Sequence, residues 1–320
     1  MQNLPSIIRL AASGLALCAM MGCSARQVQL GPQGPPILKT ERPPVIDGVL
    51  DDPCWKEAAP IRVDYLHGKE GQEANEPRMI VRYAWDEHYL YIAYETFDRN
   101  LVARSLPEKH GPPGNQRDPA MFWDPNDSNA KIDVVEFFIS FGDKQHFWEL
   151  HHNAASNFSD IWVTTPDPSW PFYNSSMCEL WGLCLLPEAY IKDEDNDTLA
   201  TAAKLKPKTD GKPSTINDAN DEDTGYTGEI RLPWYGIGAP IDWRKWYTRE
   251  IHVPKQPGKG PGPWSFIAGH EVIILAVCQN GDYPGMSMYA HASPRQIASW
   301  FHKQVDDWPR YRLVAPARGK

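Results

Sequence analysis

The sequence predicts an all-β protein, an antiparallel β-sandwich of the immunoglobulin or jelly-roll kind with long loop insertions. Composition favours this class, because 30 prolines and 23 glycines in 320 residues are too many for a mostly helical chain. Residues 81–98 alternate apolar and polar side chains around a short polar interruption, which is typical of a β-hairpin. Further short apolar segments follow, separated by proline- and aspartate-rich turns at the spacing of a sandwich.

The first 22 residues are expected to be a secretory signal. Arg9 precedes an apolar run over 10–21, which is shorter than the roughly 20 apolar residues that span a bilayer. Gly22-Cys23 after this run resembles the bacterial lipobox, in which the chain is cut before the cysteine and the cysteine is lipidated. We therefore expect an exported, membrane-anchored lipoprotein of the outer membrane, periplasm or cell surface, lipidated at Cys23. Plain secretion is the alternative.

The rest of the chain divides into a tether and one folded domain. Residues 23–43 include the run Gly31-Pro32-Gln33-Gly34-Pro35-Pro36 and are expected to be a flexible, lipid-anchored tether. Residues 44–316 are expected to form the sandwich domain. The net charge is −9 and lysines and arginines form no long run, so a nucleic acid is not expected as a partner.

Four cysteines remain after the signal: Cys54, Cys178, Cys184 and Cys278. Disulfide bonds persist in exported proteins, and four cysteines allow three pairings. Cys178 and Cys184 are close enough in sequence to pair locally, which would leave Cys54 with Cys278. The sequence does not decide among these pairings. No Cys-x-x-Cys spacing indicates a zinc or haem site made by the thiols.

The first elements are a helical turn and a hairpin. Residues 44–60 contain a turn at Asp47-Gly48 and then an acidic segment with Trp55, which could form one turn of helix. In 81–98 the apolar positions, among them Tyr83, Trp85 and Ile92, are expected to pack as central scaffold. Residues 100–129 form a long polar loop of the kind that is usually either functional or mobile.

A second hairpin is expected from 131–141 and 146–153. Shorter strands should follow at 160–163, 180–186, 199–205 and 226–232, and a long apolar strand within 266–279. Residues 206–224 are polar and rich in turn-forming residues, so we expect a solvated loop there. The acidic segments 193–197 and 218–223 are also expected to be solvated. Their oxygens are ligands that Ca²⁺ accepts, although neither segment has the EF-hand order.

Several of these segments resemble family 9 carbohydrate-binding modules and their relatives, which have a DOMON-like sandwich fold. The similarity spans about 44–314. It is carried by these stretches: Ile46-Asp47-Gly48, Leu50-Asp51, Trp55, Ala58, Arg82, Trp85-Asp86, Tyr89-Leu90-Tyr91, Asp133, Val135, Glu136, Phe138 and the segment YTGEIRLPW over 226–234. No internal repeat is evident.

The resemblance implies a site that binds the terminal sugar of a glycan. In the family, two aromatic rings on loops enclose the sugar, and a carboxylate and a basic residue bind its hydroxyls. Carried over by motif, the rings would be Trp123 and Trp300, the carboxylate Glu136 and the basic position His151. His151 replaces the family's arginine. Because side chains alternate along a strand, His151 and His152 should face opposite sides.

The implied function is to hold polysaccharide or oligosaccharide at the bacterial cell surface in support of carbohydrate catabolism. One alternative is a structural or adhesion sandwich without a sugar site. Another is an O-glycosyl hydrolase, in which Glu136 with Glu149 or Asp160 would supply the carboxylate pair. Catalytic motifs are missing, so binding is favoured over catalysis. A third alternative is a haem-binding sandwich that uses Met286, Met288, His151 or His291.

Overall fold

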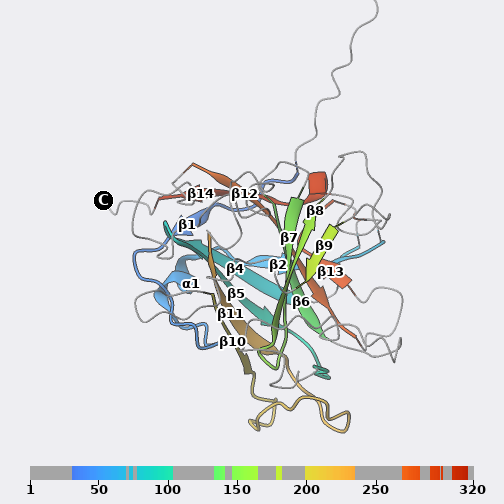
Figure 1. The fold of residues 1–320 in the computed structure, drawn as a ribbon. Coiled ribbons are helices and arrows are strands. Elements are labelled where there is room, and N and C mark those ends of the chain that lie inside the picture. Colours follow the sequence, from blue (N-terminus) through green and yellow to red (C-terminus); the bar gives the residue numbers. More distant parts are fainter. Residues whose placement is uncertain are drawn as a thin grey trace, which may run out of the picture. The chain divides into compact units, whose positions relative to one another are not determined.

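The computed structural model describes residues 31–69, 72–74, 78–103, 133–140, 146–164, 178–181, 199–234, 269–281, 289–295, 297 and 305–315. Within them almost every element is a strand, which confirms the all-β prediction (Figure 1). One continuous hydrogen-bonded order runs β10-β11-β5-β4-β1-β14-β12-β6-β7-β8-β9. It divides into two sheets that pack on each other.

The first sheet contains the predicted 81–98 hairpin. Its strands are β10 (Ala200–Leu205), β11 (Tyr226–Pro233), β5 (Tyr89–Thr96), β4 (Met79–Trp85) and the short β2 (Ile61–Val63). All of these neighbours are antiparallel. In the hairpin Trp85 pairs with Leu90 and Met79 with Thr96, so the polar interruption at 86–88 is its turn, as predicted.

The second sheet contains the predicted second hairpin, β6 with β7, which is confirmed. Its strands are β14 (Arg310–Val314), β12 (Glu271–Gln279), β6 (Val134–Ser140), β7 (His146–His152), β8 (Phe158–Thr164), β9 (Cys178–Trp181) and β13 (Tyr289–His291), which also pairs with β3 (Tyr65–Leu66).

The sheets are joined by a strand that the sequence analysis did not predict. β1 (Ile37–Lys39) lies parallel to both β4 and β14, so the fold is mixed rather than purely antiparallel. The backbone of Gly34 also donates a hydrogen bond to Arg310 O at 2.9 Å. Residues 31–39, assigned to the tether by sequence, therefore belong to the folded unit, which begins at Gly31.

The main core lies between the two sheets. Tyr94 on β5 packs against Phe137 on β6 with ring centroids 5.9 Å apart, and Tyr83 on β4 packs against Tyr311 on β14 at 5.2 Å. The expected scaffold residues Trp85 and Ile92 are buried here. Thus the aromatic hairpin identified in the sequence is interior scaffold and its inward face is not a ligand surface.

Two smaller clusters cover the outer faces of the sheets. Helix α1 (Pro53–Glu57) lays Cys54 and Trp55 on the first sheet against Ala84 and Tyr91. On the second sheet, Trp308, just after the short 3-10 helix η4 (Val305–Asp307), packs with apolar residues of β6, β7 and β12. β6 is therefore buried on both faces, which explains its nearly continuous apolar sequence.

Residues of the family-like motifs meet at one carboxylate. Glu229 on β11 is fully buried and accepts hydrogen bonds from Asp47 N at 3.0 Å, Gly48 N at 2.8 Å and Trp55 Nε1 at 2.7 Å. Gly48 adopts φ +81°, which favours glycine. The shared motif residues at these positions thus hold the turn and α1 on the first sheet, a structural role.

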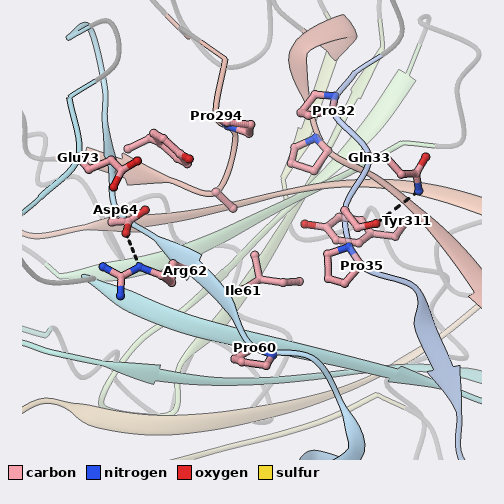
Figure 2. Close-up of a pocket in the computed structure, with 14 residues that line it drawn as sticks. Pro32, Gln33, Pro35, Pro60, Ile61, Arg62, Asp64, Glu73, Pro294 and Tyr311 are labelled. Carbon is pink, nitrogen blue, oxygen red and sulfur yellow. Dashed lines mark hydrogen bonds and ion pairs between the residues drawn. The ribbon is translucent and has the colours of Figure 1, made fainter.

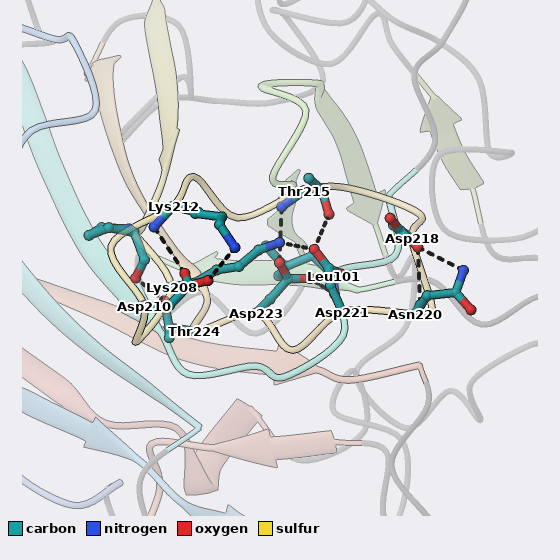
Figure 3. Close-up of polar contacts among 11 residues, drawn as sticks. Leu101, Lys208, Asp210, Lys212, Thr215, Asp218, Asn220, Asp221, Asp223 and Thr224 are labelled. Carbon is teal, nitrogen blue, oxygen red and sulfur yellow. Dashed lines mark hydrogen bonds and ion pairs between the residues drawn. The ribbon is translucent and has the colours of Figure 1, made fainter.

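The prediction that residues 206–224 form a solvated loop is wrong in part. Asp223 is buried and its carboxylate accepts hydrogen bonds from Leu101 N at 3.0 Å and Thr215 N at 2.9 Å (Figure 3). Asn217 binds both backbone groups of Ala103, at 3.1 Å from its N and 2.8 Å from its O. The loop is therefore docked onto the segment 101–103 that follows the first hairpin.

The structure also bears on the cysteines and the membrane. Cys54 and Cys278 are free, buried thiols in different hydrophobic clusters, so the pairing of Cys54 with Cys278 is wrong. Cys184 and the side chain of Cys178 lie outside the described residues, as does Cys23. Among the residues that the structure describes, no helix is both long and apolar enough to cross a membrane.

Candidate functional site

Two of the four predicted sugar-binding residues lie side by side on the second sheet. Glu136 on β6 pairs directly with His151 on β7. The neighbouring residues Val135, Phe137 and Leu150 point into the core, so Glu136 and His151 lie on the outer face of the sheet. The hairpin register alone brings this pair together.

Glu149 completes a group of three, because it lies two residues before His151 on the same face of β7. His151 Nε2 and Glu149 Oε1 are 3.0 Å apart. One ligand atom from each of Glu136, Glu149 and His151 can be chosen so that all three lie within 4.8 Å of one another. From the sequence, Glu149 was expected at the site only in the catalytic alternative. The spacing of two residues between Glu149 and His151 within a predicted strand could have indicated that they share a face.

All three side chains are buried, with exposed fractions of 6% for Glu136, 8% for Glu149 and 1% for His151. The pKa of Glu136 is raised to about 8, chiefly by burial. A charge on His151 acts to lower the Glu136 pKa, and the charge of Glu149 acts to raise it further. Among the described residues, none donates a hydrogen bond to the Glu136 carboxylate. Within the described part of the chain, the Glu136 carboxylate therefore has no hydrogen-bond donor, and the imidazole of His151 is the positive charge that acts on it.

An aromatic cluster adjoins the group on the same face. Phe138 follows Glu136 by two residues and Phe147 precedes Glu149 by two. Their ring centroids lie 5.5 Å and 5.3 Å from that of Trp308, which is fully buried. On the other side of Glu136 its pairing partner is Val277 of β12. The carboxylates and imidazole are thus set into an apolar surface, where polar interactions are strengthened.

The two predicted aromatic platforms, Trp123 and Trp300, lie outside the described residues. So do Met286 and Met288 and the side chain of Asp160. Of the two histidines in the haem alternative, His151 contacts Glu149, whereas His291 lies beside Tyr65 with ring centroids 6.2 Å apart. They therefore have different surroundings.

His152 faces the opposite side from His151, as predicted. It is fully buried, its Nδ1 is hydrogen-bonded to the Tyr94 hydroxyl at 2.6 Å, and its ring packs edge-on to that of Tyr94. Burial lowers the pKa of His152 to about 3. His152 is thus a neutral core residue.

A separate pocket of about 380 Å³ lies away from these residues (Figure 2). Sequence analysis did not identify it, because its walls come from distant segments with no shared motif. Arg62 Nε donates a hydrogen bond to Asp64 Oδ2 at 2.7 Å in this pocket. Its volume is that of a small-molecule site. The pocket is lined by Pro32, Gln33, Gly34, Pro35, Pro60, Ile61, Arg62, Asp64, Tyr65, Glu73, Ala292, Pro294, Pro309 and Tyr311.

The described acidic segment 218–223 uses its carboxylates within the protein. Asp221 pairs with Lys208 and accepts a hydrogen bond from Thr215 Oγ1 at 2.7 Å, and Asp218 accepts one from Asn220 N at 3.0 Å (Figure 3). Together with the contacts of Asp223 described above, these interactions indicate that the carboxylates of this segment stabilise the loop itself. The segment 193–197 lies outside the described residues.

The spacing of the two carboxylates is compatible both with ligand binding and with a retaining glycosidase. Retaining glycosidases hold their carboxyl groups roughly 5–5.5 Å apart, whereas inverting ones separate them by roughly 6.5–9.5 Å to admit a water. Here the nearest atoms of the two carboxylates are within 4.8 Å, and one carboxylate already contacts His151. Such a group can bind one small ligand atom or ion between its side chains.

Comparisons with known proteins agree with the architecture. A protein from Bacteroides uniformis, to which carbohydrate binding is ascribed, superposes with a TM-score of 0.51 and 11% identity over 88% of this chain and 99% of its own. What the two share is the fold. Two structures of a family 9 carbohydrate-binding module from Caldicellulosiruptor kristjanssonii superpose with lower TM-scores of 0.43, both at 13% identity. The match to the complex with cellotriose covers 89% of this chain and 96% of the module. The match to the complex with glucose covers 90% of this chain and 99% of the module.

No protein-family model matches the chain, and no curated protein matches it. The comparisons therefore establish the fold alone.

Proposed function

We propose that this protein binds carbohydrate through the outer face of the second sheet, around Glu136 and His151. The observation that carries the proposal is that β6 and β7 bring together the two residues that the family resemblance selected from separate segments. The sandwich fold shared with a protein to which carbohydrate binding is ascribed supports it.

The chemistry fits a sugar ligand. A carboxylate accepts hydrogen bonds from two hydroxyls, and an imidazole can donate one and accept another. Trp123 and Trp300 would supply the flat apolar surfaces on which the C–H faces of a sugar ring pack. Bound at this site, a polysaccharide or oligosaccharide would be held by hydrogen bonds to Glu136 and His151 between two aromatic rings.

We further propose that the mature chain is anchored by a lipid on Cys23, so that it holds glycans at the bacterial cell surface in support of their catabolism. This rests on the lipobox-like sequence at the end of the apolar run. Replacing Cys23 with Ser should move the protein from the membrane fraction to the soluble fraction and abolish its labelling by radioactive palmitate.

Affinity electrophoresis in gels that contain soluble plant, algal or mucin polysaccharides tests the sugar site. Wild-type protein should be retarded by at least one glycan. Trp123→Ala, Trp300→Ala and Glu136→Gln should each weaken binding about tenfold or more, because each removes a platform or a charged hydrogen-bond partner. Arg62→Gln, in the pocket of Figure 2, is the matched control and should bind as wild type.

Two results would contradict the proposal. Retardation that Arg62→Gln abolishes and the other three variants retain would move the sugar site to the pocket of Figure 2. A folded protein that binds no glycan in the panel would favour the structural or adhesion role.

A further inference from the structure

The sugar proposal leaves one feature of the site unused, namely the second carboxylate. Glu149 and Glu136 are both more than nine-tenths buried, and both share a face with a buried imidazole. The ion pairs of the described residues give Glu136 neither lysine nor arginine. A carboxylate buried in this way needs a compensating positive charge to be ionised, and otherwise it holds its proton.

We propose that Glu136, Glu149 and His151 form a binding site for one divalent transition-metal ion of the Zn²⁺ class. This goes beyond carbohydrate binding and does not depend on it.

The ligand types select the class of ion. Zn²⁺ and its first-row neighbours accept one imidazole nitrogen together with carboxylate oxygens. Ca²⁺ and Mg²⁺ prefer oxygen ligands alone, so His151 disfavours them. Two carboxylates and a neutral imidazole also supply the two negative charges that a divalent ion neutralises.

The geometry requires only a small adjustment. With bonds of about 2.1 Å, the ligand atoms of a tetrahedral zinc site lie roughly 3.4 Å apart. The three atoms here lie within 4.8 Å of one another, and the pair Glu149–His151 is already at 3.0 Å. Rotation of the Glu136 side chain about its own torsions can close the remaining gap, while the paired strands β6 and β7 hold all three backbones in place.

Three protein ligands leave a fourth position open. Water would fill it, and so could a sugar hydroxyl. The metal site and the sugar site can therefore share these residues without excluding each other.

The test uses the mature protein without a histidine tag, stripped with EDTA and dialysed. Zn²⁺ alone is titrated by calorimetry, and Co²⁺ alone is followed by its visible absorption. We expect saturation at one ion per chain. Glu136→Gln, Glu149→Gln and His151→Gln should each weaken Zn²⁺ binding at least tenfold. Glu136→Asp keeps a carboxylate and should recover part of the loss. Glu271→Gln, an exposed position at the start of β12, is the control and should bind as wild type.

A stability measurement guards against misfolded variants. Zn²⁺ should raise the urea midpoint of the wild-type protein and of Glu271→Gln, and leave that of folded Glu136→Gln unchanged. No saturable binding of Zn²⁺ or Co²⁺ by wild type, or binding by folded Glu136→Gln and His151→Gln at wild-type strength, overturns the proposal. Affinity electrophoresis repeated in EDTA distinguishes the metal site from the sugar site. A protein that binds glycan but no metal contradicts the metal site alone. A protein that binds metal but no glycan contradicts the proposed carbohydrate binding alone.

Discussion

Two consecutive histidines on β7 show how strand geometry separates roles at the scale of single residues. His151 lies with Glu149 on the outer face, whereas His152 lies in the core against Tyr94. Both are buried, and His151 contacts a carboxylate whereas His152 contacts the Tyr94 hydroxyl. A strand places successive side chains on opposite faces. Two adjacent buried histidines can therefore belong one to a candidate site and the other to the core.

Burial of His152 should make the protein less stable in acid. Its pKa of about 3 in the folded chain is well below the roughly 6.5 of an exposed histidine. Between these values the unfolded chain binds a proton that the folded chain does not, so the free energy of unfolding falls as the pH falls. The expected slope from this group is about 1.4 kcal/mol per pH unit below pH 6.5.

Urea unfolding at a series of pH values checks this. His152→Gln keeps a hydrogen-bonding side chain beside Tyr94 but cannot be protonated. The free energy of unfolding of this variant should therefore change with pH by about 1.4 kcal/mol per pH unit less than that of the wild-type protein. Equal slopes for the wild-type and His152→Gln proteins between pH 6.5 and 4 would show that His152 is protonated in the folded state as well.

At the scale of elements, Glu229 connects β11 with two neighbouring segments that lie at least 174 residues earlier in the sequence. Its carboxylate on β11 holds the turn at Asp47-Gly48 and, through Trp55, helix α1. Similarly, Trp234 Nε1 at the end of β11 donates to Asp86 O in the first hairpin turn at 2.9 Å. These residues are the ones that carry the family resemblance, which therefore reports the fold more directly than it reports the ligand.

Glu229→Gln should destabilise the protein by about 1–3 kcal/mol, because the amide NH₂ of glutamine would face an N–H donor on one side or the other. The free energy of unfolding in urea, measured at pH 8 and thus above the pKa of about 7 that burial gives Glu229, checks this. Glu271→Gln, the same change at an exposed strand end, should cost less than 1 kcal/mol. Equal losses in both variants would mean that the Glu229 contacts contribute little.

At the scale of the whole molecule, the two free cysteines report on opposite layers. Cys54 lies on α1 and packs against the outer face of the first sheet, and Cys278 lies on β12 in the main core. Burial raises the pKa of Cys54 to about 12 and also raises that of Cys278, so we expect neither thiol to react in the folded protein.

A thiol reagent such as Ellman's reagent should therefore label neither cysteine in buffer and both in urea. If the layers unfold together, labelling of Cys54 and of Cys278 will rise at the same urea concentration; the single variants Cys54→Ala and Cys278→Ala distinguish the two sites. Different midpoints would indicate that α1 and its turn unfold before the core. A Cys54–Cys278 disulfide would instead leave both unlabelled in urea until a reductant is added.

Much of the fold was predictable from local patterns. Alternating side chains and turn residues identified both hairpins. The family resemblance implied that Glu136 and His151 share a site, and the register of β6 with β7 pairs them. The docking of 206–224 was not predictable, because polar and turn-forming residues are expected equally in a solvated loop and in one that places Asp223 and Asn217 against a buried backbone. Burial of those contacts depends on a partner segment about a hundred residues away.

The sequence by itself thus determined the two hairpins and most of the longer strands, because period-two alternation and hairpin turns act over a few residues. The family resemblance implied that Glu136 and His151 share one site. Only the tertiary structure decided that β1 enters the sheet in parallel between β4 and β14, that Cys54 and Cys278 stay apart, and that Glu149 joins a buried group of three. Each of these depends on which distant segments pack together, and packing is set by complementary surfaces that no short stretch of sequence encodes.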